Sequence, residues 1–184
     1  MKQFIPLMLL LSGLMVTSCV ERPDPSLVLN EICGKEFPDN DWIELYNAAD
    51  TAIHLKGVYL IKIDEDGIDH VIFRFKEGTL LPGQVCVVSS LDHELRRRLS
   101  HKKELGIELI GPDDKTLDAF YRDEEVGENA HPTNGSYARI PNGTGQWAIV
   151  AQASRNQLNP DDAEIIEVDF RTGELLDDEE DEDI

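Results

Sequence analysis

The chain of 184 residues carries 37 acidic and 17 basic side chains, which give a formal net charge of −20. Proteins that bind nucleic acids need a basic surface to meet the phosphate backbone, so this balance argues against a nucleic acid partner. Apolar residues make up 41% of the chain, and between Leu27 and Asn159 they suffice for the core of one domain of ordinary size.

The chain begins with the features of a secretory signal. Met1-Lys2-Gln3 carries one positive charge, and Phe4 to Val16 is an apolar run that is too short to cross a membrane. The run closes on Thr17-Ser18-Cys19, which resembles the lipobox of bacterial lipoproteins. That resemblance implies removal of residues 1–18 as a signal peptide and acylation of Cys19, with palmitate among the acyl groups. The alternative is a free thiol at the end of an ordinary secretory signal.

The residues after Cys19 bear on location. Val20 follows the cysteine, where no aspartate is found, and by resemblance to lipoprotein sorting this implies the outer membrane of a cell envelope. The periplasmic side and the cell surface both stay open. Residues 19–26 contain Pro23 and Pro25 and no apolar pattern, which indicates a short tether.

Short runs of strand-forming residues follow, separated by Gly, Pro and Asn turn signals. They occupy residues 27–33, 42–46, 53–63 (one or two strands around Gly57), 70–75, 84–89, 106–110, 116–121, 136–140 and 146–150. The Asp66-Gly67 pair suits the positive φ of a tight hairpin turn. Many short strands at this spacing predict an all-β fold of the sandwich type.

One segment has helical spacing instead. Leu91, Leu95 and Leu99 lie four residues apart, which predicts one apolar face of a short inserted helix that Ser90 could cap. The densest basic cluster of the chain occurs here and consists of Arg96, Arg97, Arg98, Lys102 and Lys103. These are the candidate partner-binding residues, for the acidic tail or for lipid phosphates, although a solvated helix face is the simplest interpretation.

Five blocks carry the most distinctive pattern in the chain. They are Leu29-Asn30-Glu31-Ile32, Asp41-Trp42-Ile43-Glu44-Leu45-Tyr46-Asn47, Leu55-Lys56-Gly57-Val58-Tyr59-Leu60, Gly78-Thr79-Leu80-Leu81-Pro82-Gly83-Gln84 and Ala138-Arg139-Ile140-Pro141-Asn142-Gly143. Together they resemble the lamin tail domain as it occurs in bacterial secreted proteins. The resemblance covers residues 27–159 and implies an immunoglobulin-like β-sandwich.

Several residues in these blocks have plain structural interpretations. We expect Trp42, Leu45 and Trp147 in the core, because large apolar side chains contribute most to a sandwich interior. We expect Glu31 and Glu44 to hold a loop by accepting backbone N–H bonds. The less favoured alternative is a hydrolase that uses them as an acid pair, since glycosidases place two carboxylates ~5–10 Å apart.

No catalytic constellation stands out in the sequence. The chain has no Gly-x-Ser-x-Gly elbow, no His-Glu-x-x-His helix and no Gly-rich phosphate loop. Its five histidines are scattered without the spacing of metal ligands. We therefore expect a protein that is not an enzyme, with no catalytic residues and no resident cofactor.

Calcium is a weakly supported exception, because hard cations prefer several oxygen ligands. Asp64, Asp66 and Asp69 cluster around a turn, and Asp39 and Asp41 precede a strand. Neither cluster matches the twelve-residue calcium loop, so solvated turns are the simpler interpretation.

Two further sites are suggested by single residues. Asp50-Thr51-Ala52 resembles the O-glycosylation site of Bacteroidetes-type bacteria, so Thr51 is a glycosylation candidate. Cys33 and Cys86 lie in predicted strands, where buried thiols are favoured over a disulfide, although an oxidising envelope would allow the pair to form.

The last segment, residues 160–184, is an acidic tail. Residues 161–184 hold thirteen acids and one base, and such blocks of like charge repel themselves, so we expect most of the tail to be disordered. Residues 165–170 alternate well enough to add an edge strand.

The function most consistent with these features is a lipid-anchored, non-catalytic module of the cell envelope that presents sandwich loops to a protein or glycan partner. The alternative is a structural or accessory envelope domain whose acidic tail binds divalent cations or a basic partner.

Overall fold

The computed structural model describes residues 26–34, 41–91, 95–100, 102–129 and 134–168. The predictions for the signal peptide, for Cys19, for the tether up to residue 25, for Asp39 and for the acids from Asp177 to Asp183 lie outside these residues.

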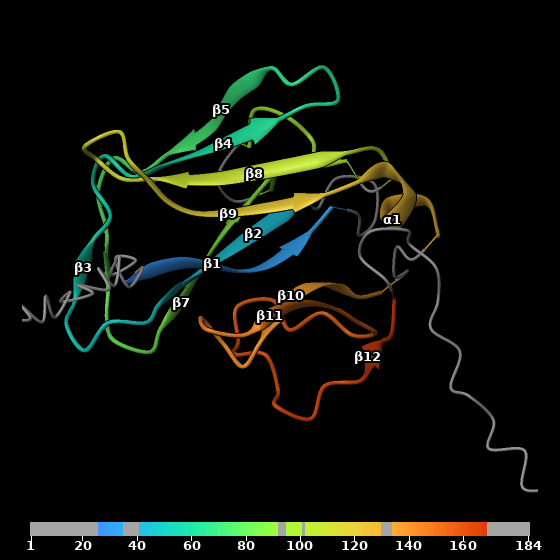
Figure 1. Ribbon diagram of the computed structural model, residues 1–184. Helices are drawn as coiled ribbons and strands as arrows, with labels where there is room; N and C mark the ends of the chain where they lie inside the picture. Colours follow the sequence, from blue (N-terminus) through green and yellow to red (C-terminus); the bar gives the residue numbers. More distant parts are fainter. Residues whose placement is uncertain (1–25, 35–40, 92–94, 101, 130–133, 169–184) are drawn as a thin grey trace, which may run out of the picture.

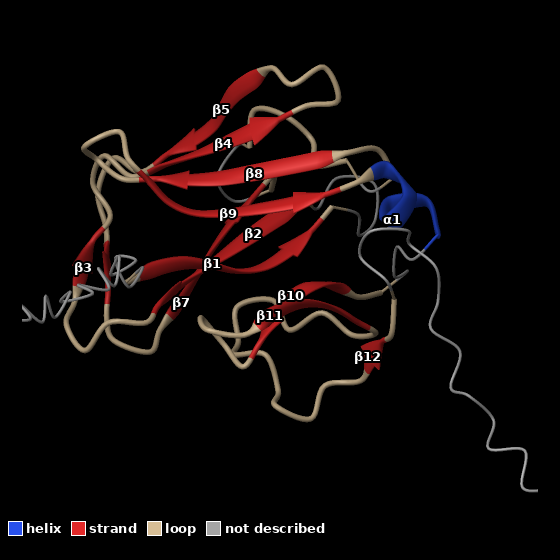
Figure 2. Ribbon diagram, viewed as in Figure 1, coloured by secondary structure: helices blue, strands red, loops and turns tan. Residues whose placement is uncertain are grey.

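Strands are the main regular structure of the described part, and loops connect them (Figure 2). Its strands are β1 (Leu27–Cys33), β2 (Trp42–Asn47), β3 (Ile53–His54), β4 (Tyr59–Ile63), β5 (Asp69–Arg74), β6 (Thr79–Leu80), β7 (Val85–Ser89), β8 (Leu105–Ile110), β9 (Thr116–Arg122), β10 (Ser136–Ile140), β11 (Gln146–Val150) and β12 (Ile165–Ile166). One helix is described, α1 (Glu124–Asn129). The all-β prediction is confirmed.

Two main antiparallel sheets form an immunoglobulin-like β-sandwich. One sheet has six strands in the order β12-β11-β10-β1-β2-β7, and the other has four in the order β5-β4-β8-β9. A small pair, β3-β6, closes one end. Figure 1 shows β5, at the top, as the outer strand of the four-stranded sheet, with β9 nearest to β1.

The core lies between the two sheets and is made of alternating side chains from both. Trp42 and Leu45 are fully buried, and Trp147 is half-buried against the core. Phe120 of β9 lies between the rings of Tyr137 and Trp147, with centroid distances of 5.3 and 4.8 Å. Burial of such large side chains is the main stabilising contribution to a sandwich.

An ion pair joins the two sheets. The Arg139 guanidinium of β10 donates two hydrogen bonds to the Asp118 carboxylate of β9, at 2.8 and 2.9 Å. The same carboxylate accepts the backbone N–H of Leu29, and Arg139 also donates to the Leu29 carbonyl. The pair therefore fixes how β9 lies against β1 and β10.

The predicted helix over residues 91–99 is not found in its described part, because Leu95 to Leu99 contains no helical residue. Backbone N–H groups that would pair within a helix donate instead to residues that are distant in sequence. The Arg96 N–H donates to the Ile72 carbonyl, and the Leu99 N–H donates to the Asp41 carboxylate. Leu99 is buried whereas Leu91 is 63% exposed, so the leucines do not share an apolar face.

The described helix α1 occurs instead in a segment without an apolar stripe. Its first turn carries Glu124 and Glu125, which favour the positive end of the helix dipole. No helix among the described residues is long and apolar enough to span a bilayer.

The folded part continues past the predicted boundary at Asn159. The edge strand predicted over residues 165–170 is found at its start, as β12, which pairs with β11. Residues 169 and 170 lie outside the described residues. Val168 is only 9% exposed and belongs to the core cluster. Part of the predicted tail is therefore a strand of the sandwich.

Candidate functional site

Glu31 and Glu44 face each other across two neighbouring strands. Glu31 of β1 is paired in register with Glu44 of β2, and a register shift between Leu29 and Glu31 makes Asn30 a bulge residue. A bulge redirects neighbouring side chains, and here Asn30, Glu31 and Glu44 all lie in one buried polar cluster.

Both carboxylates hold the loop that follows β11. The Glu31 carboxylate accepts the Ser154 backbone N–H at 2.9 Å and the Ser154 hydroxyl at 2.8 Å, and also the Ser136 hydroxyl. The Glu44 carboxylate accepts the Asn156 backbone N–H at 2.8 Å. The prediction that the two glutamates bind loop backbone is confirmed.

Three asparagines complete the cluster. The Asn30 amide donates to both Glu44 and the Asn142 carbonyl oxygen, at 3.1 and 2.9 Å. Asn142 exchanges two hydrogen bonds with the backbone of Asn159, and the Asn159 amide donates to the carbonyls of Asn30 and Arg139. Buried polar groups that are satisfied in this way fix one loop conformation.

This arrangement argues against the alternative in which Glu31 and Glu44 are the acid pair of a hydrolase. Glu31 and Glu44 are 0% exposed, so no substrate reaches them, and backbone and side-chain donors occupy their oxygens. Burial raises the pKa of both carboxyls, and the nearby Glu31 charge helps to raise that of Glu44 to about 8. The raised pKa values of Glu31 and Glu44 therefore result from their burial in a structural cluster.

The acidic calcium candidates that are described serve local structure. The Asp64 carboxylate accepts the N–H groups of Asp66 and Ile68 and lies 2.7 Å from the His70 ring nitrogen. These contacts lower the pKa of Asp64, chiefly through the Ile68 N–H. Asp41 accepts the Leu99 N–H. Within the described ranges, no three potential ligands gather at one point.

The remaining single-residue candidates have simple surroundings. Thr51 is exposed in the loop between β2 and β3, where its carbonyl accepts the Asn47 amide at 2.9 Å. Its glycosylation stays a prediction. Cys33 is buried and donates to the Gly135 carbonyl, and Cys86 is half-buried, with no disulfide between the two. Burial raises the pKa of Cys86 to about 12.

The structure separates the basic residues that the sequence grouped together. Lys103 forms an ion pair with Glu65 at 2.5 Å, and Arg98 lines the same acidic hollow. The backbone carbonyls of Lys102 and Lys103 accept hydrogen bonds from the buried Arg122 guanidinium. Arg97 is exposed. Arg96 lines a different surface, along the edge of β5.

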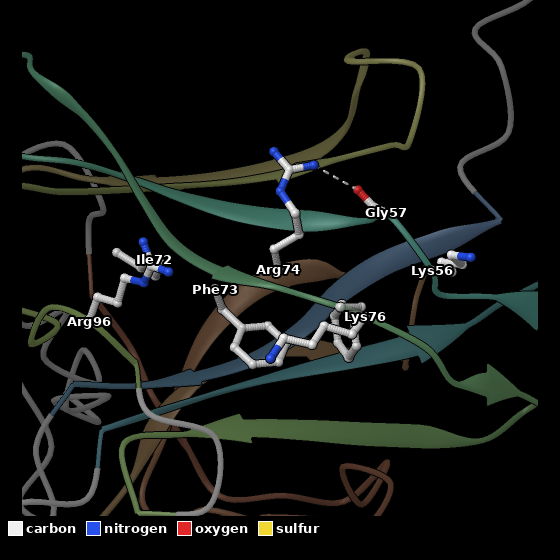
Figure 3. Close-up of a pocket in the computed structure, with 8 residues that line it drawn as sticks. Lys56, Gly57, Ile72, Phe73, Arg74, Lys76 and Arg96 are labelled. Carbon is white, nitrogen blue, oxygen red and sulfur yellow. Dashed lines mark hydrogen bonds between the residues drawn. The ribbon is translucent and has the colours of Figure 1, made fainter.

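That surface is a groove of about 550 Å³, which we call the β5 groove (Figure 3). It is lined by Lys56, Gly57, Ile72, Phe73, Arg74, Phe75, Lys76 and Arg96. Among the described residues, its walls hold four cations and no carboxylate. None of the ion pairs found among the described residues uses one of these four cations.

Strand pairing explains why these cations converge. Arg74 lies opposite Tyr59 in the β4–β5 ladder, and its guanidinium stacks 3.8 Å from the centroid of the Tyr59 ring. One of its N–H groups donates to the Gly57 carbonyl at 3.2 Å, which Figure 3 shows. Such stacking positions an arginine with little loss of its other donors.

Arg96 reaches the groove through its own backbone. Its N–H donates to the Ile72 carbonyl at 3.1 Å, so the segment from Leu95 runs beside the outer edge of β5. Figure 3 shows the Arg96 side chain next to Ile72, at the end of the groove away from Lys56. The four cations thus come from three segments that are distant in sequence.

The floor of the groove is aromatic. Phe73 and Phe75 are half-buried and pack edge to face, with ring centroids 4.8 Å apart. An adjoining hollow shares both rings and adds Glu77 and Thr79. Cations around an apolar floor form a site for a negatively charged group that also carries apolar surface.

Sequence reasoning missed three of the four groove cations. Arg74 and Lys76 alternate with Phe73 and Phe75, which is the pattern of a strand with one basic face. Lys56 and Arg96 join the β5 groove only through strand pairing and tertiary contacts, which a single sequence does not reveal.

A further hollow among the described residues has a different character. About 490 Å³ in volume, it lies between the start of β1 and the loop before β9, and its charges include both Asp113 and Lys115. Those two side chains form an exposed ion pair at 2.7 Å. Because its charges are already matched, this hollow has less attraction for an ionic partner.

Comparison with known proteins gives little beyond the fold. No family model matches the chain, and no curated protein matches it. The periplasmic stator protein FlaG of the Sulfolobus acidocaldarius archaellum is 17% identical, with 52% of this chain and 96% of FlaG covered and a TM-score of 0.39. The archaellum FlaF–FlaG stator complex of the same organism gives 16% identity, 64% and 99% coverage and a TM-score of 0.39. At these values neither structure informs the function of this chain.

Proposed function

We propose that this protein is a non-catalytic binding module of the cell envelope, held at the outer membrane by lipid on Cys19, and that its β5 groove binds an anionic protein or glycan. The observation that carries the binding proposal is the set of four cations without a lining carboxylate, in a chain of net charge −20. The lamin tail resemblance stays a prediction.

The charge of the whole chain makes the groove selective. A net negative protein repels polyanions at long range, so an anion that binds must gain enough from local contacts to overcome that repulsion. Charge-assisted hydrogen bonds from Arg74 and Arg96, together with the ammonium groups of Lys56 and Lys76, offer such contacts.

The binding test compares two variants of equal charge. The groove variant combines Lys56→Gln, Lys76→Gln and Arg96→Gln, and the control variant combines Lys102→Gln, Lys103→Gln and Lys115→Gln. Arg74 is retained because its stacking on Tyr59 is also structural. Both changes remove three exposed cations.

We expect the groove variant to bind oligogalacturonate or polyglutamate at least about tenfold more weakly than the unaltered chain, because three charge-assisted contacts are lost. The control variant should bind within about twofold of the unaltered chain. Calorimetric titration at low salt measures both. Equal weakening of the two variants would contradict the proposed site.

The anchor proposal rests on the lipobox-like residues 16–19 and has its own test. Mass spectrometry of the membrane-extracted protein should find a chain that begins at Cys19 and carries acyl groups, and Cys19→Ser should release the protein from membranes. An unmodified N-terminus on the native protein would refute the anchor.

A further inference from the structure

The β5 groove leaves four cations without an acidic partner among the described residues, while the densest acidic run of the chain lies beyond Val168. That run is Asp177-Asp178-Glu179-Glu180-Asp181-Glu182-Asp183. Its carboxylates therefore complement the charge of the groove.

The run is long enough to reach the groove from the domain that carries it. Asp177 is nine residues after Val168, and an extended chain of that length spans about 30 Å. A compact domain of about 140 residues has a radius of gyration of about 14 Å, so its opposite faces lie about 35 Å apart. The seven acids that follow extend the reach by about 20 Å.

Tethering favours this contact over an intermolecular one. A segment linked to its binding site by a short flexible connection has an effective concentration in the millimolar range. At physiological salt the charges attract one another only within about 8 Å, so the attraction acts where the cations are concentrated. Among the described cations, Lys103 and Lys115 are already paired with Glu65 and Asp113.

We propose that residues 177–183 of this chain dock in its own β5 groove, with their carboxylates against the four cations. This docking has a consequence for binding, which rests on the proposed function. The docked segment competes with an anionic partner and lowers the apparent affinity of the groove, by about tenfold if the tail binds with a dissociation constant near a tenth of its effective concentration.

Zero-length crosslinking tests the docking itself. A carbodiimide joins a lysine amine to a carboxylate that touches it, and peptide mass spectrometry locates the joined residues in the full chain. We expect crosslinks from residues 177–183 to Lys56 and Lys76 that persist on dilution and disappear in about 1 M salt. Lys102 and Lys115 serve as exposed controls and should crosslink several-fold less. Crosslinks spread evenly over all exposed lysines, or lost on dilution, would overturn the docking.

Competition tests the consequence and separates the two proposals. In a tail variant, the seven acids from Asp177 to Asp183 are changed to Asn or Gln, and oligogalacturonate binding is measured beside the unaltered chain. A gain of about tenfold supports the inference. Equal binding by both chains overturns the inference and leaves the proposed function standing. A tail variant that binds no better than its own Lys56→Gln, Lys76→Gln, Arg96→Gln derivative overturns the proposed function.

Discussion

At the scale of single residues, the main feature is a pair of buried glutamates. Glu31 and Glu44 accept hydrogen bonds from the loop that follows β11 and hold it in place. The bulge at Asn30 brings an asparagine and a glutamate of β1 onto the same polar cluster as Glu44 of β2. Gly143 completes it, because its N–H donates to Asn30 and its φ of 75° is accessible mainly to glycine. A side chain at Gly143 would also clash with the Tyr46 ring.

The raised pKa of Glu44 predicts a pH dependence of stability. Burial and the Glu31 charge raise its pKa from 4.5 to about 8. Between these values the folded chain holds a proton that the unfolded chain has released, so a rise in pH favours unfolding. The free energy of unfolding should fall by up to about 1.4 kcal/mol per pH unit in that window.

Glu44→Gln should reduce this slope, because the amide cannot ionise, whereas Glu77→Gln, at an exposed position, should leave it unchanged. Urea unfolding followed at several pH values between 5 and 8 gives the slopes. A Glu44→Gln chain with the full slope of the unaltered protein would show that another group titrates.

At the scale of elements, the ion pair between β9 and β10 is the contact that sets the sheets against each other. The Arg139 and Asp118 side chains are only 16% and 13% exposed, so Asp118→Asn would leave a buried guanidinium with a weaker partner. We expect a loss of about 3 kcal/mol in the free energy of unfolding.

Asp113→Asn is the matched control, because it removes the carboxylate of an exposed pair with Lys115. Exposed pairs contribute little, so its unfolding curve should overlay that of the unaltered chain. Chemical denaturation compares the two. If Asp118→Asn were as well tolerated as Asp113→Asn, the Arg139–Asp118 contact would not fasten the sheets.

The strands were predictable because alternation and turn residues are local properties. Residues 27–33 and 146–150 were predicted with the bounds that β1 and β11 have. The helix predicted over 91–99 is wrong in its described part. Its leucine spacing is a local signal, and the backbone N–H groups of Leu99 and Arg96 donate instead to Asp41 and Ile72. The two-residue strand β6 is too short to give a periodic signal.

The candidate site was less predictable than the fold. Glu31 and Glu44 could be assigned from their positions in a strand motif, and their loop-binding role is confirmed. The β5 groove could not, because Lys56, Arg74 and Arg96 meet only when β4, β5 and the chain around Leu95 come together. A cluster that is contiguous in sequence, such as Arg96 to Lys103, was instead divided by the fold.

At the scale of the whole molecule, charge is distributed unevenly between a groove and the rest of the chain. The net charge of −20 keeps polyanions away, whereas the β5 groove gathers four cations that form no ion pair with the described residues. The proposed binding module would select partners at this surface by local charge and apolar contact rather than by general attraction.

The most direct measurement of this claim is a nuclear magnetic resonance titration of the isotope-labelled full chain, with its tail acids neutralised, by oligogalacturonate. The account predicts amide shifts concentrated at Lys56, Gly57, residues 72–76 and Arg96, with little change at residues 113–117. Shifts centred on residues 113–117, or on the acidic turn at residues 64–69, would contradict it.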